Sequence, residues 1–335
     1  MPTSPPDPDT VTARARCPIG KTVLRQLVAA LLTVLAMSVV TFLATNIKSP
    51  QDVARGALGR HATSEQITAF VAAHDLTAAL PVRYTRWLGD FVQGDWGTSV
   101  VTDRPIQPEL VPRLARTVLL VGLSFLVVVP LSIAMGGYLA QRWGSRRDIA
   151  ATSGLMVLSA LPEFVVGVGA ILLFSVLIGV LPPESGTAIA FGTPEAKTAA
   201  YLLPALTLVL VAAPFLTRLT RASAREGLTA PHTRAATLRG LPRRIVIWDY
   251  GMRSCAVPIV SATGLTLIHL LGSTIVVENL FGFPGLGQAL VSAVGTGDTV
   301  AVQAIAVLTA ALFVAISLLT DLLATLFNPQ LRSAR

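Results

Sequence analysis

The feature that most constrains this chain is a series of six apolar runs, each close to the length of a helix that crosses a membrane. Charged residues separate the runs and are scarce inside them. About 20 apolar residues in a helix cross the hydrocarbon core of a bilayer, because each residue advances the helix by about 1.5 Å. The predicted transmembrane helices lie at residues 24–47, 117–141, 150–180, 198–217, 254–277 and 299–327.

The composition of the whole chain supports this interpretation. Only 13% of the 335 residues are charged and 53% are hydrophobic, whereas a soluble domain usually has about 25% charged residues. Such hydrophobicity excludes a chain that is disordered throughout. We therefore predict an all-α integral membrane fold, with a disordered cytoplasmic tail at residues 1–20 and a transmembrane domain at residues 21–335.

The first run has an alternative interpretation as a cleaved secretory signal. Its apolar stretch exceeds the roughly 7–15 residues usual in such signals, and no clean cleavage site of small residues follows. We expect it to be retained as a helix. The polar segment 48–116 comes next, and its pattern predicts short helices around residues 64–74 and 81–91.

Lys and Arg are distributed unequally between the two sides that six spans define. The side with both termini carries 17 of the 26, and the other side carries nine, eight of them in the long segment 48–116. Because Lys and Arg are enriched in cytoplasmic loops, we predict cytoplasmic termini and an external segment 48–116. The net charge of +8 then reflects orientation, since nucleic-acid binding would require a basic patch on a soluble domain.

One cytoplasmic loop, at residues 218–253, is strongly basic. It contains eight Arg and only two acidic residues, Glu226 and Asp249, and is too polar to insert into the bilayer. Its first part favours a helix, and Gly240 and Pro242 are typical of a helix end. A short helix on the cytoplasmic face suits the docking of a partner. The alternative is a loop that only sets the topology.

The sequence contains no motif for catalysis or metal binding. It has no phosphate-binding loop, no H-E-x-x-H and no G-x-S-x-G, and its four His and two Cys lack ligand spacing. Glu163 is one of the few ionisable residues within a predicted span. A charge there is costly unless it faces protein or water, so Glu163 is a candidate for a translocation path. The alternative is a carboxyl group that is neutral or hydrogen-bonded to neighbouring backbone.

Residues 220–241 resemble the segment T-R-S-S-L-L-E-V-L-x-x-D-Y-V-R-T-A-R-A-K-G-L, without gaps. That segment belongs to binding-protein-dependent ABC transporter permeases of the dipeptide, oligopeptide and nickel type. The family's D-Y is replaced by Pro231 and His232, and its Lys by Arg239. The matching residues include Arg221, Glu226, Arg234, Ala236, Gly240 and Leu241.

Other motifs of the family follow the same order along the chain, and the resemblance covers about residues 20–332. Residues 80–89 and 94–99 are similar to P-L-x-x-R-Y-x-x-W-L and G-D-x-G-x-S, residues 161–164 to S-x-P-x-F, and residues 275–287 to V-V-V-E-T-V-F-x-x-P-G-L-G.

The resemblance implies a type I ABC importer permease in the cytoplasmic membrane that translocates dipeptides or oligopeptides. A nickel or haem permease of the same family is one alternative. Another is a secondary transporter driven by an ion gradient, which the lack of an internal repeat disfavours. The implied partners are a second homologous permease, two ATPases that hold ATP and Mg²⁺, an external binding protein and the lipid bilayer. For the chain itself we expect no catalysis, cofactor, metal or nucleic acid.

The resemblance also implies two groups of site residues. One is a coupling helix at about residues 232–240 that docks on an ATPase. The other lies along the translocation path and at its external gate, where a Gly- and Pro-rich stretch suits a re-entrant turn or, alternatively, a packing hairpin. The docking residues are Glu226, Arg234, Ala235, Ala236, Leu238, Arg239, Gly240 and Leu241, with Ala235, Ala236 and Leu238 as the apolar face; the path and gate residues are Glu163, Glu278, Phe281, Pro284, Gly285 and Gly287.

Overall fold

The computed structural model describes residues 19–46, 51, 54–55, 62–73, 78–253 and 255–327, and most of these residues are helical. Residues 1–18 of the predicted tail lie outside the described residues. The elements are α1 (Ile19–Asn46), α3 (Ser64–Ala73), α4 (Leu80–Val92), α5 (Gln107–Gln141), α6 (Arg146–Ala160), α7 (Glu163–Ala170), η2 (Ile171–Leu177), α8 (Gly186–Phe191), α9 (Pro194–Thr229), α10 (Pro231–Leu238), α11 (Arg243–Ile245), η3 (Val246–Met252), α12 (Ala256–Leu280), α13 (Leu286–Thr296) and α14 (Thr299–Phe327).

Five helices are long and apolar enough to cross a membrane: α1, α5, α9, α12 and α14. The predicted all-α membrane fold is therefore confirmed for the described residues. Two helices extend well beyond the predicted spans, because α5 begins ten residues earlier and α9 continues through the first part of the basic loop. The two short helices predicted in segment 48–116 are found as α3 and α4.

The predicted span at residues 150–180 is not one straight helix. α6 and the segment Glu163–Leu177 are bent by 107° relative to each other, and the described residues contain six spans only if this pair counts as one. Leu161 and Pro162 have extended backbone angles, with ψ of 132° and 148°. Proline has no N–H for the helical ladder and disfavours a helical residue before it, so Pro162 explains the break.

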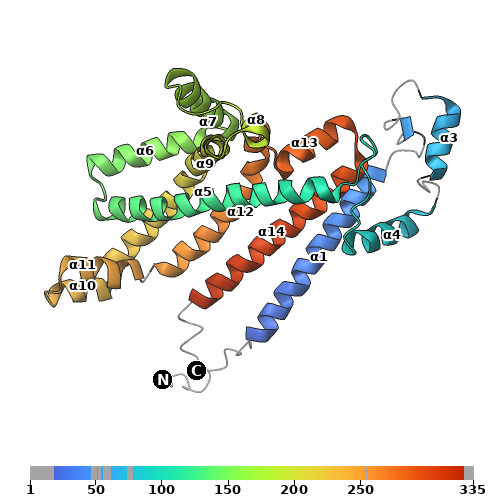
Figure 1. Cartoon of the computed structure of the whole chain (residues 1–335). Coiled ribbons are helices and arrows are strands. Elements are labelled where there is room, and N and C mark those ends of the chain that lie inside the picture. The colour runs from blue at the N-terminus through green and yellow to red at the C-terminus, as the bar shows by residue number, and fades with distance from the viewer. Residues whose placement is uncertain are drawn as a thin grey trace, which may run out of the picture.

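The spans are arranged as neighbours that start from α9 and end at α1 (Figure 1). α5 runs along α9, α12 packs on α9 and α5, α14 packs on α12, and α1 lies outermost beside α14. α6 and α7 cover another part of α9. The largest apolar core lies where α5, α9 and α12 meet, and its fully buried members include Leu120, Val128, Leu203, Leu208, Leu270 and Val277.

The close contact between α5 and α9 depends on a glycine. A Cβ atom on Gly136 would lie 2.7 Å from Cβ of Thr220 and 2.8 Å from the carbonyl oxygen of Thr217. Lipid tails are as apolar as the helices, so helix association in a membrane relies on close van der Waals packing at small residues. Gly136 therefore sets the distance between these two spans.

α4 is attached to the C-terminal part of α1 by aromatic rings and polar groups. The Ser38 and Tyr84 hydroxyls are 2.8 Å apart, and Arg83 donates a hydrogen bond of 2.5 Å to Oδ1 of Asn46. The aromatic rings continue this contact from α1 to the loop after α4, with centroids 5.4–6.1 Å apart; they belong to Phe42, Tyr84, Trp87, Phe91 and Trp96.

Candidate functional site

Glu278 holds the turn between α12 and α13 together. Its carboxylate is fully buried, and Oε1 accepts a hydrogen bond of 2.6 Å from the Thr117 hydroxyl. Oε2 accepts hydrogen bonds from the backbone N–H groups of Gly287 (2.7 Å) and Gln288 (3.3 Å). The first N–H groups of a helix lack partners within the helix and favour a negative charge. Glu278 therefore fastens the start of α13 to α12 and, through Thr117, to α5.

Two glycines let the chain pass this close to the carboxylate. A Cβ atom on Gly285 would collide with the carboxyl group of Glu278, and one on Gly287 would lie 2.6 Å from Cα of Ile275. A third glycine, Gly282, has a φ of +58°, which is accessible to glycine at little cost. The P-G-L-G pattern is thus explained by the space around Glu278.

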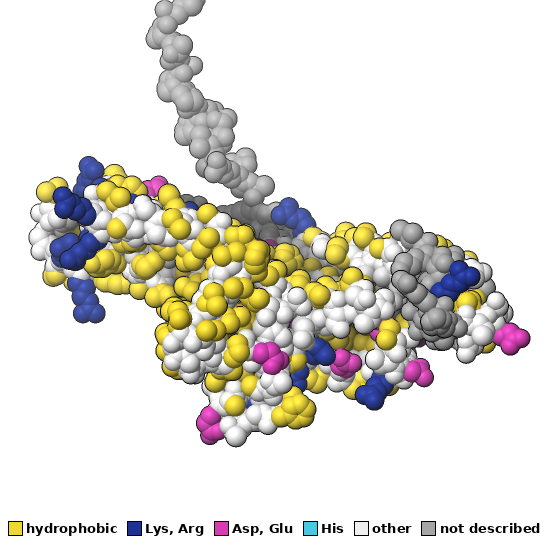
Figure 2. Space-filling model, turned by 90° about the horizontal axis from the view of Figure 1, so that it is seen from above, with side chains coloured by type: hydrophobic (Ala, Val, Ile, Leu, Met, Phe, Trp, Pro, Cys, Tyr) yellow, Lys and Arg dark blue, Asp and Glu magenta, His cyan; other side chains and the backbone are white. Residues whose placement is uncertain are grey.

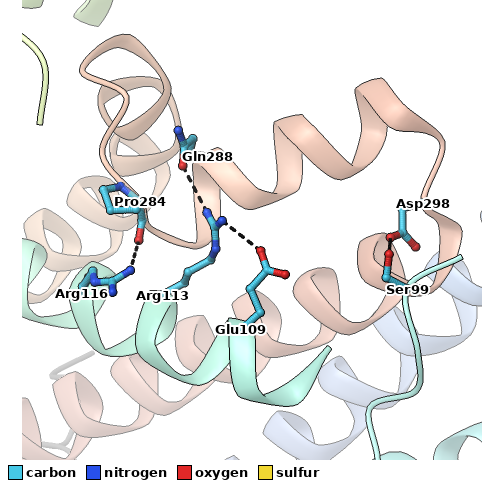
Figure 3. A network of polar contacts seen from close by, with 7 residues as sticks. All are labelled: Ser99, Glu109, Arg113, Arg116, Pro284, Gln288 and Asp298. Atoms are coloured by element: carbon cyan, nitrogen blue, oxygen red, sulfur yellow. Dashed lines mark hydrogen bonds and ion pairs between the residues drawn. The ribbon is translucent and has the colours of Figure 1, made fainter. Parts of the chain in front are cut away.

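Arginines of α5 support the same turn (Figure 3). Arg116 donates a hydrogen bond of 3.1 Å to the carbonyl oxygen of Pro284. Arg113 donates one of 3.2 Å to the side-chain oxygen of Gln288 and forms an ion pair of 3.0 Å with Glu109. The turn is therefore held both by arginines of α5 and by Glu278 of α12.

Asp298 holds the other end of α13. Its carboxylate accepts a hydrogen bond from the Ser99 hydroxyl (Figure 3). It also accepts one of 3.1 Å from the backbone N–H of Ala301. The first contact comes from the segment before α5 and the second from the first turn of α14. α13 is thus joined at both ends to elements distant in sequence.

Five of the six predicted path and gate residues lie together in this turn: Glu278, Phe281, Pro284, Gly285 and Gly287. Phe281 is fully buried in the core, and its carbonyl oxygen accepts a hydrogen bond of 2.8 Å from the N–H of Ser185. The neighbouring ring of Phe283 packs edge-on against Tyr201, with centroids 4.9 Å apart. This packing favours the hairpin interpretation of the turn over an open re-entrant loop.

Glu163, the sixth residue, lies elsewhere. It begins α7 directly after the break in the third span, and it is half-buried. Its Oε1 accepts a hydrogen bond of 2.6 Å from the Ser273 hydroxyl of α12. The partner is a side chain of another span, where the sequence had suggested nearby backbone.

The basic loop contains a short helix, α10, folded back on the end of α9. The Thr233 hydroxyl donates a hydrogen bond of 2.8 Å to the carbonyl oxygen of Gly227. Gly240 ends the turn with a φ of +74°, and its N–H bonds to the carbonyl oxygen of Thr237 at 3.0 Å. The first contact holds α10 against the end of α9, and the positive φ of Gly240 lets the chain turn after α10.

The exposed face of α10 differs from the expected one at one position. Ala236, expected on the docking face, is 2% exposed and packs within the chain together with Thr233. It lies on the opposite side of the helix from Leu238, which is 88% exposed. The other expected residues, Arg234, Ala235, Arg239 and Gly240, are exposed, as is Glu226 on α9, while Leu241 is half-buried.

A buried ion pair joins the basic end of α9 to the turn between α5 and α6. Arg221 binds both oxygens of Asp148, each at 2.6 Å, and the Asp148 side chain is only 1% exposed. The guanidinium also lies 3.8 Å from the ring centroid of Trp143. Asp148 further accepts a hydrogen bond of 2.8 Å from the N–H of Gly144.

Sequence reasoning did not identify Asp148. The local signal is the pattern Ser145-x-x-Asp148 before an apolar run, which is typical of a helix start. Ser145 does cap α6, since its hydroxyl accepts a hydrogen bond of 3.2 Å from the Asp148 N–H. That pattern predicts the cap and gives no indication of the partner on α9.

These features define a multi-pass membrane protein with a polar tip that carries a short exposed helix. Among the described residues no three His, Cys, Asp or Glu side chains are grouped as a metal site would require. The chain belongs to the binding-protein-dependent transport system inner membrane component family, which matches residues 129–333, and residues 20–118 match the N-terminal component of such proteins. It is therefore a permease of the inner membrane, as the motifs predicted.

Similar proteins match more than nine-tenths of the chain. A glutathione transport system permease protein of Pectobacterium atrosepticum is 34% identical over 314 residues, covering 92% of this chain and 98% of that protein. A probable peptide ABC transporter permease protein of Sinorhizobium fredii is 29% identical over 314 residues, covering 94% of this chain and all of that protein.

Proposed function

We propose that this chain is the transmembrane permease subunit of an ATP-driven importer, and that its substrates are peptides. The observation that carries the proposal is the similarity, over more than nine-tenths of the chain, to permeases named for peptide and glutathione transport. Glutathione is itself a small peptide. ATP and Mg²⁺ then belong to separate ATPase subunits, and a second permease and an external binding protein complete the importer.

The distribution of arginine supports the orientation of this subunit. α10 and α11 lie at the same end of the molecule as the turn between α5 and α6 (Figure 1). That turn and the whole loop at residues 218–253 together hold 11 of the 17 basic residues of the predicted cytoplasmic side. Cytoplasmic loops are enriched in Lys and Arg. We place this end, and both termini, in the cytoplasm. A C-terminal alkaline phosphatase fusion, active only outside the cytoplasm, should stay inactive.

The exposed side of α10 suits docking on an ATPase. Leu238 has almost no contact with its own chain, and Arg234 and Arg239 flank it on the surface. Burying a leucine side chain contributes about 1.5–3 kcal/mol, and arginines beside it can pair with carboxylates of a partner. Ala235 lies on this side, whereas Ala236 and Thr233 hold α10 on α9.

α9 gives the docking helix a direct connection to the membrane. It is one helix of 36 residues, and α10 follows it after the single residue Ala230. The ion pair between Arg221 and Asp148 joins the same end of α9 to α6. A displacement of α10 by the ATPases would therefore move α9 and α6 together, and α9 packs on α5, α7 and α12.

The external end of the path is assigned to the turn after α12. Glu278, Phe281, Pro284, Gly285 and Gly287 make a rigid, buried structure there, which suits a closed outer end. Glu163 is assigned to the path beside α12, because it is a half-buried carboxylate at a break in a span.

Co-purification with the ATPases tests the docking proposal. The variant Leu238→Ser should co-purify with at least about tenfold less ATPase than the unchanged chain. This reduction corresponds to the free energy of burying one leucine. Its own thermal stability should not change, because the side chain is exposed. Phe191→Ser is the control, since Phe191 is equally exposed on α8, away from α10. Equal ATPase recovery with both variants would reject α10 as the docking site.

A further inference from the structure

The turn between α5 and α6 carries three arginines without acidic partners. Arg142, Arg146 and Arg147 are exposed, and in the described part of the chain none of them forms an ion pair with a carboxylate. They line a shallow hollow of about 530 Å³ that is wide open to the surface, together with Gln141, Trp143 and Ser145. Figure 2 shows Lys and Arg side chains gathered at the left end of the molecule, where this turn lies.

The position of the turn along α9 supports a location at the membrane surface. It directly follows α5, which is apolar enough to span the bilayer. It is level with Arg221 of α9, as the contacts of Arg221 with Asp148 and Trp143 show. α9 continues for eight residues beyond Arg221, so the turn lies about 12 Å before the end of α9, measured along that helix.

Aromatic side chains at the turn support the same position. Trp143 is 46% exposed although Arg221 covers its ring. Tyr138 is exposed one turn earlier on α5, and the guanidinium of Arg142 lies 4.5 Å from its ring centroid. Exposed Trp and Tyr beside arginines are typical of the level of the lipid headgroups.

We propose that this hollow binds the phosphate of an anionic phospholipid of the cytoplasmic leaflet. Guanidinium groups bind phosphate through paired charge-assisted hydrogen bonds, and basic groups at this level are attracted to anionic lipids. Three arginines line the hollow and no carboxylate does, so the complementary group is an anion. An acidic partner protein would meet α10 first, because α10 follows the end of α9, which lies about 12 Å further along that helix than the turn. The level of the turn therefore favours lipid.

Quenching of Trp143 fluorescence tests the proposal. The full chain with Trp87, Trp96 and Trp248 each changed to Phe is placed in vesicles that contain either brominated phosphatidylglycerol or brominated phosphatidylcholine at the same mole fraction. We expect at least about twofold stronger quenching by the anionic lipid. Equal quenching by the two lipids would overturn the proposal.

Paired arginine variants provide the matched control. Arg146→Gln with Arg147→Gln should abolish the preference, whereas Arg243→Gln with Arg244→Gln removes the same charge from α11 and should preserve it. Equal loss in both pairs would indicate a general charge effect and overturn the site. Inorganic phosphate should not reduce the quenching more than chloride of equal ionic strength does. A specific effect of phosphate would assign the hollow to a free anion.

Native mass spectrometry of the chain with all its tryptophans avoids dependence on the fluorescence variants. In a mixture of the two lipids, the chain should retain phosphatidylglycerol, and the Arg146→Gln, Arg147→Gln pair should retain less than half as much. Unchanged retention would overturn the proposal. If the paired variant retained the lipid unchanged but lost ATPase co-purification, the arginines would be assigned to a protein partner instead.

Discussion

Two buried carboxylates organise this protein at the scale of single residues. Glu278 joins three elements at one end of the molecule, and Asp148 joins α6 to α9 at the other. Each carboxylate accepts hydrogen bonds from a backbone N–H as well as from a side chain. A buried charge is tolerated when it is paired and hydrogen-bonded in this way.

Removal of the Glu278 side chain should destabilise the protein. Glu278→Ala leaves the Thr117 hydroxyl and two backbone N–H groups without their acceptor, and each buried unsatisfied group costs about 1–3 kcal/mol. The expected result is a clear drop in the melting temperature in detergent. Glu195→Ala removes an exposed carboxylate at the start of α9 and should have little effect. A similar drop in both variants would contradict the assigned role.

Asp148 and Arg221 should be energetically coupled. Asp148→Ala leaves a largely buried guanidinium unpaired, and loss of one partner of a buried pair costs about 3–5 kcal/mol. Arg221→Ala should also destabilise, and the double variant should lose less than the sum of the two. A double-mutant cycle of unfolding free energies measures this coupling. Asp148→Ala combined with Arg225→Ala is the control cycle, in which the two losses of stability should add. Additive losses for Asp148→Ala and Arg221→Ala as well would refute the ion pair.

The sequence motifs predicted one of these two residues. The spacing of Glu278, Pro284, Gly285 and Gly287 places all four within one turn, so a local pattern was sufficient. Asp148 and Arg221 are 73 residues apart, and no local pattern links residues so distant. The burial of Ala236 was missed for a related reason, because the fold of α10 onto α9 decides which face is exposed.

At the scale of elements, length and apolarity predicted the spans well. They could not predict the bend of 107° in the third span, since apolarity continues through the break and only Pro162 marks it. The extension of α9 beyond its apolar part was also missed. Its polar residues there are stabilised by contacts with α6 and η3, which are distant in sequence.

The crossing of α5 and α9 provides a test at this scale. Gly136→Ala should destabilise by about 1–3 kcal/mol, because its Cβ would force the two helices apart. Gly122→Ala is the control on the same helix, since no atom lies within 4 Å of its added Cβ. Gly122→Ala should be neutral or slightly stabilising, as alanine favours a helix more than glycine does. Thermal unfolding in detergent compares them, and equal effects would contradict the close crossing.

In the whole molecule, the proposed docking helix α10 lies at one end and the turn after α12 lies at the other. α9 and α12 connect the two ends through the core. The fold class and the family were predictable from the sequence, because both depend on patterns along the chain. The arrangement of the spans around α9 was not, since it depends on which apolar faces meet.

Uptake by the reconstituted importer tests the central claim most directly. The chain is incorporated into proteoliposomes with its partner permease and ATPases, and uptake of a labelled peptide is measured with the binding protein present. The account predicts uptake only with ATP, and strongly reduced uptake with Leu238→Ser but not with Phe191→Ser. Uptake by the chain alone, driven by a pH gradient without ATP, would contradict it.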